Sequence, residues 1–205
     1  MLKKMFNAFL GREKSSVTAP GIHGMHSGQA QYIEGRPDLL AREGYGRNTW
    51  VYACVRAISS AASNIPLVVY TKDADGELTE QPHHPLQKLM ESPNAELSAA
   101  DFLENVYAYL LLHGNTYIEL NGPNDNSPPT EIWSWRPDRT SIIPGAEGVE
   151  KIVYKVNGQE FAMDYERMIH VKHFSPLDDY YGMSPLQVGR YVVTMDNSTS
   201  EWNTS

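Results

Sequence analysis

The sequence of 205 residues contains a single cysteine, Cys54. One cysteine excludes an intrachain disulfide and a zinc site built from paired cysteines. No apolar run approaches the roughly 20 residues that a membrane-spanning helix requires. Basic residues are also few, with 17 Lys and Arg against 25 Asp and Glu, which gives a net charge of −8. The chain as a whole therefore lacks the positive charge that is typical of nucleic-acid-binding proteins.

The motifs of several common enzyme classes are missing as well. The sequence has no phosphate-binding P-loop, no GxGxxG dinucleotide fingerprint, no GxSxG nucleophile turn and no HExxH zinc helix. Two adjacent acidic residues in a predicted loop, Asp178 and Asp179, are typical of solvated carboxylates rather than of a general acid and base held in distinct environments. We therefore predict a non-enzymatic chain with no catalytic, cofactor-binding or metal-ligating residues.

Histidine leaves one enzymatic alternative open, a metal-dependent hydrolase. The sequence contains seven histidines, and the ligands of such a site would be His83, His84, His170 and His173. His170 and His173 are three residues apart on a predicted strand, so their side chains point to opposite faces, which is poor geometry for one metal ion. This alternative predicts bound metal and an activity that depends on these histidines.

The central amphipathic segment is 48–70, NTWVYACVRAISSAASNIPLVVY. At 100° per residue, its large and small apolar residues fall in one arc of about 140°, which predicts the buried face of a helix formed by Trp50, Val51, Cys54, Val55, Ile58, Ala61, Ala62 and Ile65. Asn48 or Thr49 is suited to cap this helix, and Pro66 ends it. Residues 67–70 are expected to form a buried strand.

Two further helices and several short strands follow. The second helix begins at Ser98 and ends at Gly114, and short strands are predicted at 115–120, 131–135, 141–144, 149–156, 159–163 and 168–174. Asp75-Gly76 and Asn157-Gly158 predict hairpin turns. The third helix begins at Ser184 and Pro185 and continues to Ser205 without a stop signal. Its exposed apolar strip is a candidate for self-association: Val188, Tyr191, Val192, Met195 and Trp202.

These elements predict three parts of the chain and an α+β fold. Residues 1–47 are expected to form a flexible N-terminal arm, because 11–47 contain seven glycines and two prolines without a sustained hydrophobic period. Residues 48–183 form the folded domain, and 184–205 begin a helix that leads out of it. The first ten residues are weakly amphipathic, which leaves a peripheral membrane tether as a further alternative.

Six stretches occur in order along the chain: WVYACVRAISSAASNIPLVVY at 50–70, HPLQKLMESPNAELSAADFLENVYAYLLLHGNTYIEL at 84–120, WSWRPDRTSIIP at 133–144, VYKVNG at 153–158, MIHVKHF at 168–174 and GMSPL at 182–186. As an ordered set they resemble the portal protein family of tailed double-stranded DNA bacteriophages, in its smaller, lambda-like siphovirus type. The resemblance implies a wing-like α+β domain in which long helices pack on short mixed or antiparallel strands and hairpins.

The resemblance also implies a function in assembly. Portal subunits form a homo-oligomeric ring, usually a dodecamer, at one vertex of a procapsid that is assembled in the host cytoplasm, and the ring remains in the virion. Its expected partners are the major capsid protein and scaffold, the terminase large subunit and the head-completion proteins. Double-stranded DNA passes through the channel without specific binding. Because the packaging ATPase belongs to the terminase, the absence of an active site is expected.

The resemblance further implies that a family member continues for about as long again after the helix that starts at GMSPL. That later portion supplies much of the stem, the clip and the channel lining. A chain of 205 residues is expected to lack it.

Overall fold

The computed structural model describes residues 41–124, 127–145 and 148–204, and most of the predicted N-terminal arm (1–47) lies outside these ranges. A π-helical turn, η1 (Ala41–Tyr45), precedes the predicted domain start at Asn48. The ring of Tyr45 lies 5.0 Å from that of Tyr52, which attaches the turn to the first long helix. The described residues thus include helical structure on the N-terminal side of the predicted boundary.

Helices and antiparallel strands confirm the α+β class. The helices are α3 (Thr49–Ser63), α4 (Pro85–Glu91), α5 (Ala99–His113), α6 (Pro185–Val188) and α7 (Arg190–Thr204), with short 3-10 turns at η2 (Pro137–Arg139) and η3 (Tyr165–Arg167). The strands are β1 (Tyr70–Lys72), β2 (Leu78–Glu80), β3 (Asn115–Asn121), β4 (Glu131–Trp135), β5 (Thr140–Gly145), β6 (Gly148–Val156), β7 (Gln159–Asp164) and β8 (Met168–Lys172).

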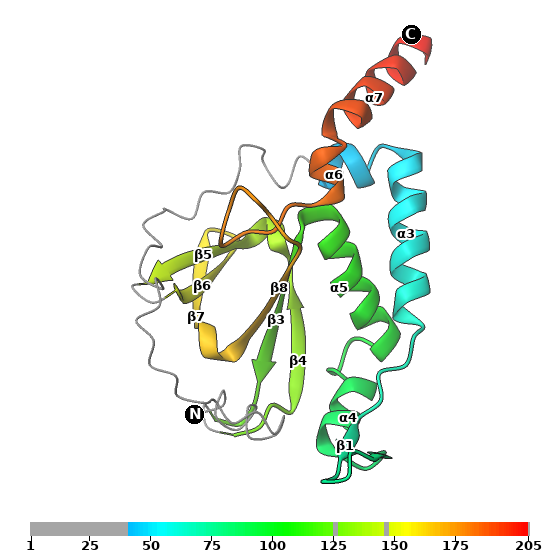
Figure 1. Ribbon diagram of the computed structural model, residues 1–205. Coiled ribbons are helices and arrows are strands. Elements are labelled where there is room, and N and C mark those ends of the chain that lie inside the picture. The colour runs from blue at the N-terminus through cyan, green and yellow to red at the C-terminus, as the bar shows by residue number, and fades with distance from the viewer. Residues whose placement is uncertain (1–40, 125–126, 146–147, 205) are drawn as a thin grey trace.

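These elements are stacked in layers (Figure 1). Helix α3 packs along α5, and α5 covers one face of a three-stranded sheet with the order β4-β3-β8. The opposite face of that sheet packs against a second three-stranded sheet with the order β5-β6-β7. The β1–β2 hairpin lies beside α4 at the far end of α3 from α7. Helix α7 projects from the other end of the molecule.

Three apolar clusters hold the layers together. Between the two sheets lie Tyr117, Ile142, Ile152, Met168, Tyr180 and Tyr181. Between α5 and the first sheet lie Leu89, Phe102, Val106 and Ile132. Where α3, α5 and α6 meet lie Val55, Leu112 and Leu186. Alternation along β3 explains the division, because Tyr117 faces the second sheet while Ile118 and Leu120 face α5.

The local signals read from the sequence are confirmed where they involve caps and turns. The side chain of Ser98 accepts a hydrogen bond from the Asp101 backbone N–H at the start of α5, and Gly114 ends that helix with φ of 71°. Asn157 and Gly158 have φ of 51° and 79°, as a two-residue hairpin turn with positive φ at both central positions requires. Such signals depend on the backbone alone, so they do not require knowledge of the tertiary contacts.

The predicted buried face of α3 is largely wrong. Trp50 is 75% exposed, Ile58 is 53% exposed, and Cys54 is exposed as well. The buried residues of α3 are Val55, which belongs to the predicted face, together with Ser59 and Ser63, which do not. Small serine side chains allow the two helix backbones to approach, and the hydroxyls of Ser59 and Ser63 bond to carbonyl oxygens one turn earlier in α3. The helix therefore buries one edge of the predicted apolar arc and exposes the rest.

Residues 67–70 also differ from the prediction. The hairpin forms, but β1 includes only the last of these residues, and both of its strands are exposed. The preceding backbone pairs with the buried side chain of Gln87 in α4. The N–H of Val69 donates to Gln87 Oε1 (3.0 Å), and Gln87 Nε2 donates to the carbonyl oxygen of Leu67 (3.3 Å). A side chain thus replaces a neighbouring strand, which the sequence pattern does not reveal.

The third predicted helix is divided in two. Ser184 caps α6 and Pro185 opens it, as predicted, but α6 ends at Val188 and α7 begins at Arg190. The intervening Gly189 donates its N–H to the carbonyl oxygens of Gln187 and Pro185, which tightens the last turn. The break lets α7 take its own direction away from the body.

A buried amide, Asn115, joins three distant segments of the chain. Its Nδ2 donates to the carbonyl oxygens of His113 (2.8 Å) and Gly182 (3.2 Å). Its Oδ1 accepts from the N–H of Gly182 (2.8 Å) and lies 3.1 Å from His170 Nε2. A Cβ on Gly114 would lie 2.6 Å from the Gly182 carbonyl oxygen, so the two backbones meet only because glycine stands there. We call this arrangement the Asn115 junction.

We expect Asn115→Ala to destabilise the fold by at least about 2 kcal/mol, because each buried polar group left without a partner costs about 1–3 kcal/mol. The matched control is Asn121→Ala at the exposed end of the same strand, which should change the free energy of unfolding by less than about 0.5 kcal/mol. Urea unfolding followed by circular dichroism measures both. Equal effects of the two substitutions would contradict the role assigned to the junction.

Candidate assembly surface

The structure gives the hydrolase alternative no ligand set. His83 is exposed, and the imidazole of His84 caps α4 by accepting a hydrogen bond from the Leu86 N–H (3.0 Å). His170 is part of the Asn115 junction. Within the described ranges, no group of three or more His, Cys, Asp or Glu side chains is arranged to hold a metal ion.

His113 and His170 are structural histidines. The ring of His170 stacks on that of Tyr117 with a centroid distance of 4.5 Å. Burial, and to a smaller extent the nearby Lys172 ammonium, lowers the pKa of His170 to about 4. Burial also lowers the pKa of His113 to about 4, against the opposing effect of the Asp138 carboxylate. Both imidazoles are therefore neutral at pH 7.

The loop at 178–181 is also structural. Asp178 Oδ1 accepts hydrogen bonds from the N–H groups of Tyr180 (2.6 Å) and Tyr181 (2.9 Å). The two tyrosines are buried, and the Tyr181 hydroxyl accepts from the N–H of Ile142 (2.8 Å). Asp179 is exposed, as predicted, while Asp178 shapes a turn that places two aromatic rings between the sheets.

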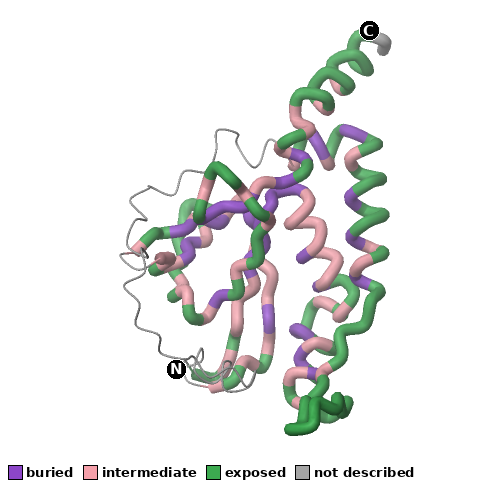
Figure 2. The backbone as a smooth tube through the Cα atoms, viewed as in Figure 1, coloured by how far each residue is buried: buried purple, intermediate pink, exposed green. Residues whose placement is uncertain are grey.

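The exposed apolar side chains of two long helices form a more prominent feature. We define the α7 stripe as Tyr191, Val192, Met195 and Trp202, which are 71–88% exposed. We define the α3 stripe as Trp50, Cys54, Ile58 and Ala61, all of which are exposed. Figure 2 shows α7 as mostly exposed, and α3 as exposed residues that alternate with buried and partly buried ones. Contiguous apolar surface on a helix is typical of a protein–protein contact.

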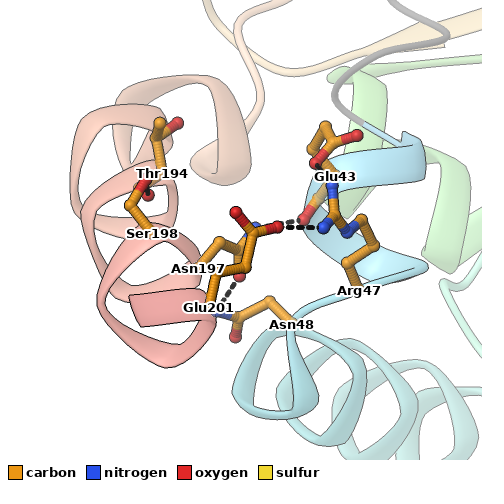
Figure 3. Close-up of polar contacts among 7 residues, drawn as sticks. All are labelled: Glu43, Arg47, Asn48, Thr194, Asn197, Ser198 and Glu201. Carbon is orange, nitrogen blue, oxygen red and sulfur yellow. Dashed lines mark hydrogen bonds and ion pairs between the residues drawn. The ribbon is translucent and has the colours of Figure 1, made fainter. Parts of the chain in front are cut away.

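Polar contacts fix the opposite side of α7 to the body (Figure 3). Asn48 Nδ2 donates to Asp196 Oδ2 (2.7 Å) and Asn197 Oδ1 (3.0 Å), while its own Oδ1 accepts from the N–H groups of Trp50 and Val51 at the start of α3. Asn197 Nδ2 donates to the carbonyl oxygen of Glu43 (2.8 Å). Arg47 pairs with both Glu43 and Glu201. These contacts orient α7 while its apolar stripe faces solvent.

The sequence identified one of the two stripes. The open apolar strip on the third helix was predicted and is exposed, although Val188 belongs to α6. The α3 stripe was missed because hydrophobic periodicity identifies an apolar face but not what covers it. The sequence signal that could have identified the buried side of α3 is its serine face. Ser59 and Ser63 recur at helical spacing and permit close packing on α5.

A family model described as phage portal protein matches residues 49–205. The chain belongs to the phage portal protein family. This assignment confirms the resemblance seen in the sequence. The lambda-like siphovirus subtype stays a prediction.

Two curated relatives carry no assigned function. An uncharacterized protein of Rickettsia bellii (strain RML369-C) is 27% identical over all of this chain and 52% of its own length. An uncharacterized protein of Rickettsia felis (strain ATCC VR-1525 / URRWXCal2) is 28% identical over 80% of this chain and 42% of its own length. The chain thus spans about half the length of the curated relatives it matches.

The fold is shared with solved structures of gene transfer agent particles. A chain from the neck of an empty particle, computed with C6 symmetry, is 28% identical with a TM-score of 0.76, over 89% of this chain and 49% of that one. A chain from the neck of the native particle, computed with C12 symmetry, is 27% identical with a TM-score of 0.73, over 88% and 48%. A chain from the native virion is 28% identical with a TM-score of 0.74, over 88% and 48%.

The buried histidines predict a loss of stability in acid. The ordinary pKa of histidine is about 6.5, so between about pH 6.5 and pH 4 the unfolded chain binds protons that the folded chain does not. The free energy of unfolding should therefore fall as the pH is lowered through this range, by at most roughly 1.4 kcal/mol per pH unit for each histidine. Urea unfolding at several pH values should show a shallower dependence for His170→Gln and an unchanged one for His83→Gln. Equal pH dependence of the free energy of unfolding in the wild type and in both variants would contradict this prediction.

The polar contacts at the base of α7 predict a second result. Asn197→Ala removes the hydrogen bonds to Asn48 and Glu43 but leaves the cap of α3 intact, so amides of α7 should exchange with deuterium faster. Ser198→Ala is the matched control, because its hydroxyl bonds only to the Thr194 carbonyl oxygen within the same helix. Faster exchange in both variants, or in neither, would show that these contacts do not hold the helix.

Proposed function

We propose that the chain is a structural subunit of a portal ring, located at the unique vertex of a phage-like particle. The observation that carries the proposal is the match to the phage portal family over 49–205. The likeness to chains from particle necks that were computed with C6 and C12 symmetry supports a homo-oligomeric ring. The exposed stripes of α3 and α7 supply apolar surface for contacts between subunits.

The partners that follow from this role are the capsid shell with its scaffold, the terminase large subunit and the head-completion proteins. Double-stranded DNA would pass through the ring channel during packaging. The net charge of −8 supports passage without tight binding, because phosphate contacts require basic residues. The chain spans about half the length of its curated relatives, so its contribution to the channel lining and to the terminase contact is part of the proposal. The virion is the proposed location of the assembled ring.

A ring subunit should associate reversibly with other copies of itself, to an extent that increases with protein concentration. We expect the mass from light scattering to rise from that of the 23.0 kDa monomer toward that of a closed ring of about a dozen copies as concentration increases. Negative-stain electron microscopy of the largest species should show rings with a central channel. A chain that stays monomeric at every concentration, with no rings on the grid, would contradict self-assembly by this polypeptide.

A further inference from the structure

The α3 stripe and the α7 stripe have matching properties. Each runs from an aromatic residue along one side of a helix, from Trp50 to Ala61 and from Tyr191 to Trp202. At 1.5 Å per residue, both stripes are about 16 Å long. Neither contains a charged residue. Two apolar helix faces of equal length are suited to pack against each other through ridges and grooves.

These stripes do not meet within one chain. The contacts of Asn48 hold the start of α3 against the polar side of α7. From this point the two helices run in opposite directions, α3 along α5 and α7 away from the body (Figure 1). At 100° per residue, the α7 stripe is centred roughly 160° from the side that includes Val193, Asn197 and Ser200. The α7 stripe therefore faces away from its own subunit.

We propose that the α7 stripe of one subunit packs on the α3 stripe of the next copy of this chain, so that repetition of the contact closes the ring. The proposal rests on the proposed function, because that function supplies a second copy as the occupant. A closed ring requires two different surfaces on each subunit, one for each neighbour. The two stripes meet this requirement because they lie on helices in different parts of the molecule and a single subunit leaves both exposed.

Cys54 provides a direct test, because the only cysteine of the chain lies within the α3 stripe. In a Met195→Cys variant, a short bismaleimide reagent should link Cys54 of one copy to the new cysteine of the next. Repetition around the ring should then give a ladder of covalent species larger than dimers. The wild type and the Cys54→Ser/Met195→Cys variant each carry one cysteine, so neither should give species beyond a dimer.

The matched control is Thr194→Cys, which places a thiol one residue away on another side of α7, in a position that is also exposed. It should give no ladder under the same conditions. Ladders of equal extent from both variants would indicate random collision and overturn the proposal. Dimers alone from Met195→Cys would indicate a two-fold contact and overturn it as well.

A mixing experiment tests the contact between the two stripes without a cross-linking reagent. Ile58→Asp should disable the α3 stripe, and Met195→Asp should disable the α7 stripe, so each variant alone should remain monomeric. An equal mixture should form a dimer through the one intact pair of stripes and no larger species. Dimers formed by either variant alone, or no association in the mixture, would overturn the proposal.

The outcomes separate this inference from the proposed function. Rings of about a dozen copies without the Cys54 ladder would place the subunit contact elsewhere and leave the portal function intact. Absence of rings, ladder and mixed dimers would overturn both.

Discussion

The Asn115 junction is the contact on which the rest of the structure depends. One buried side chain ties the end of α5 to β8 and to the backbone just before α6. The same point fixes the start of β3, the middle strand of the β4-β3-β8 sheet, and the place where the chain leaves the body toward α6. Because Ser184 is buried next to Gly182 and caps α6, the exit of the C-terminal helices is set by the same buried contacts. An amide suits this position because it donates and accepts at once, whereas an apolar side chain would leave the Gly182 backbone unpaired.

Much of the fold follows from the sequence, and what does not follow is a matter of tertiary contact. Ser98, Gly114 and the Asn157-Gly158 turn act through local backbone chemistry, so their helix ends and hairpin were predicted. The buried side of α3 was predicted wrongly because apolar periodicity records where apolar residues lie, not which layer covers them. Gln87 illustrates the same limit, since its bonds to residues 67 and 69 are formed between segments with no shared sequence signal.

The polar clusters that suggested chemistry serve packing instead. His84 caps a helix, His170 stacks on Tyr117, and Asp178 bonds to the backbone of the two tyrosines that follow it. Each of these groups is used by the fold through a contact that is visible in the structure. These residues therefore contribute to the folded structure of this member of the phage portal protein family. Candidate functional surface in such a protein is therefore found where apolar side chains remain uncovered, rather than where titratable groups gather.

Helix α7 is held by polar contacts on one side and exposes apolar side chains on the other. Asp196, Asn197 and Glu201 hold it to the body through directional polar contacts, which set its angle. Its apolar stripe faces the opposite way and remains exposed in the single subunit. Hydrogen bonds specify direction, whereas apolar burial supplies most of the free energy of association. A helix whose angle is fixed before association loses less conformational freedom when it binds a neighbour, which lowers the entropic cost of each contact around a ring.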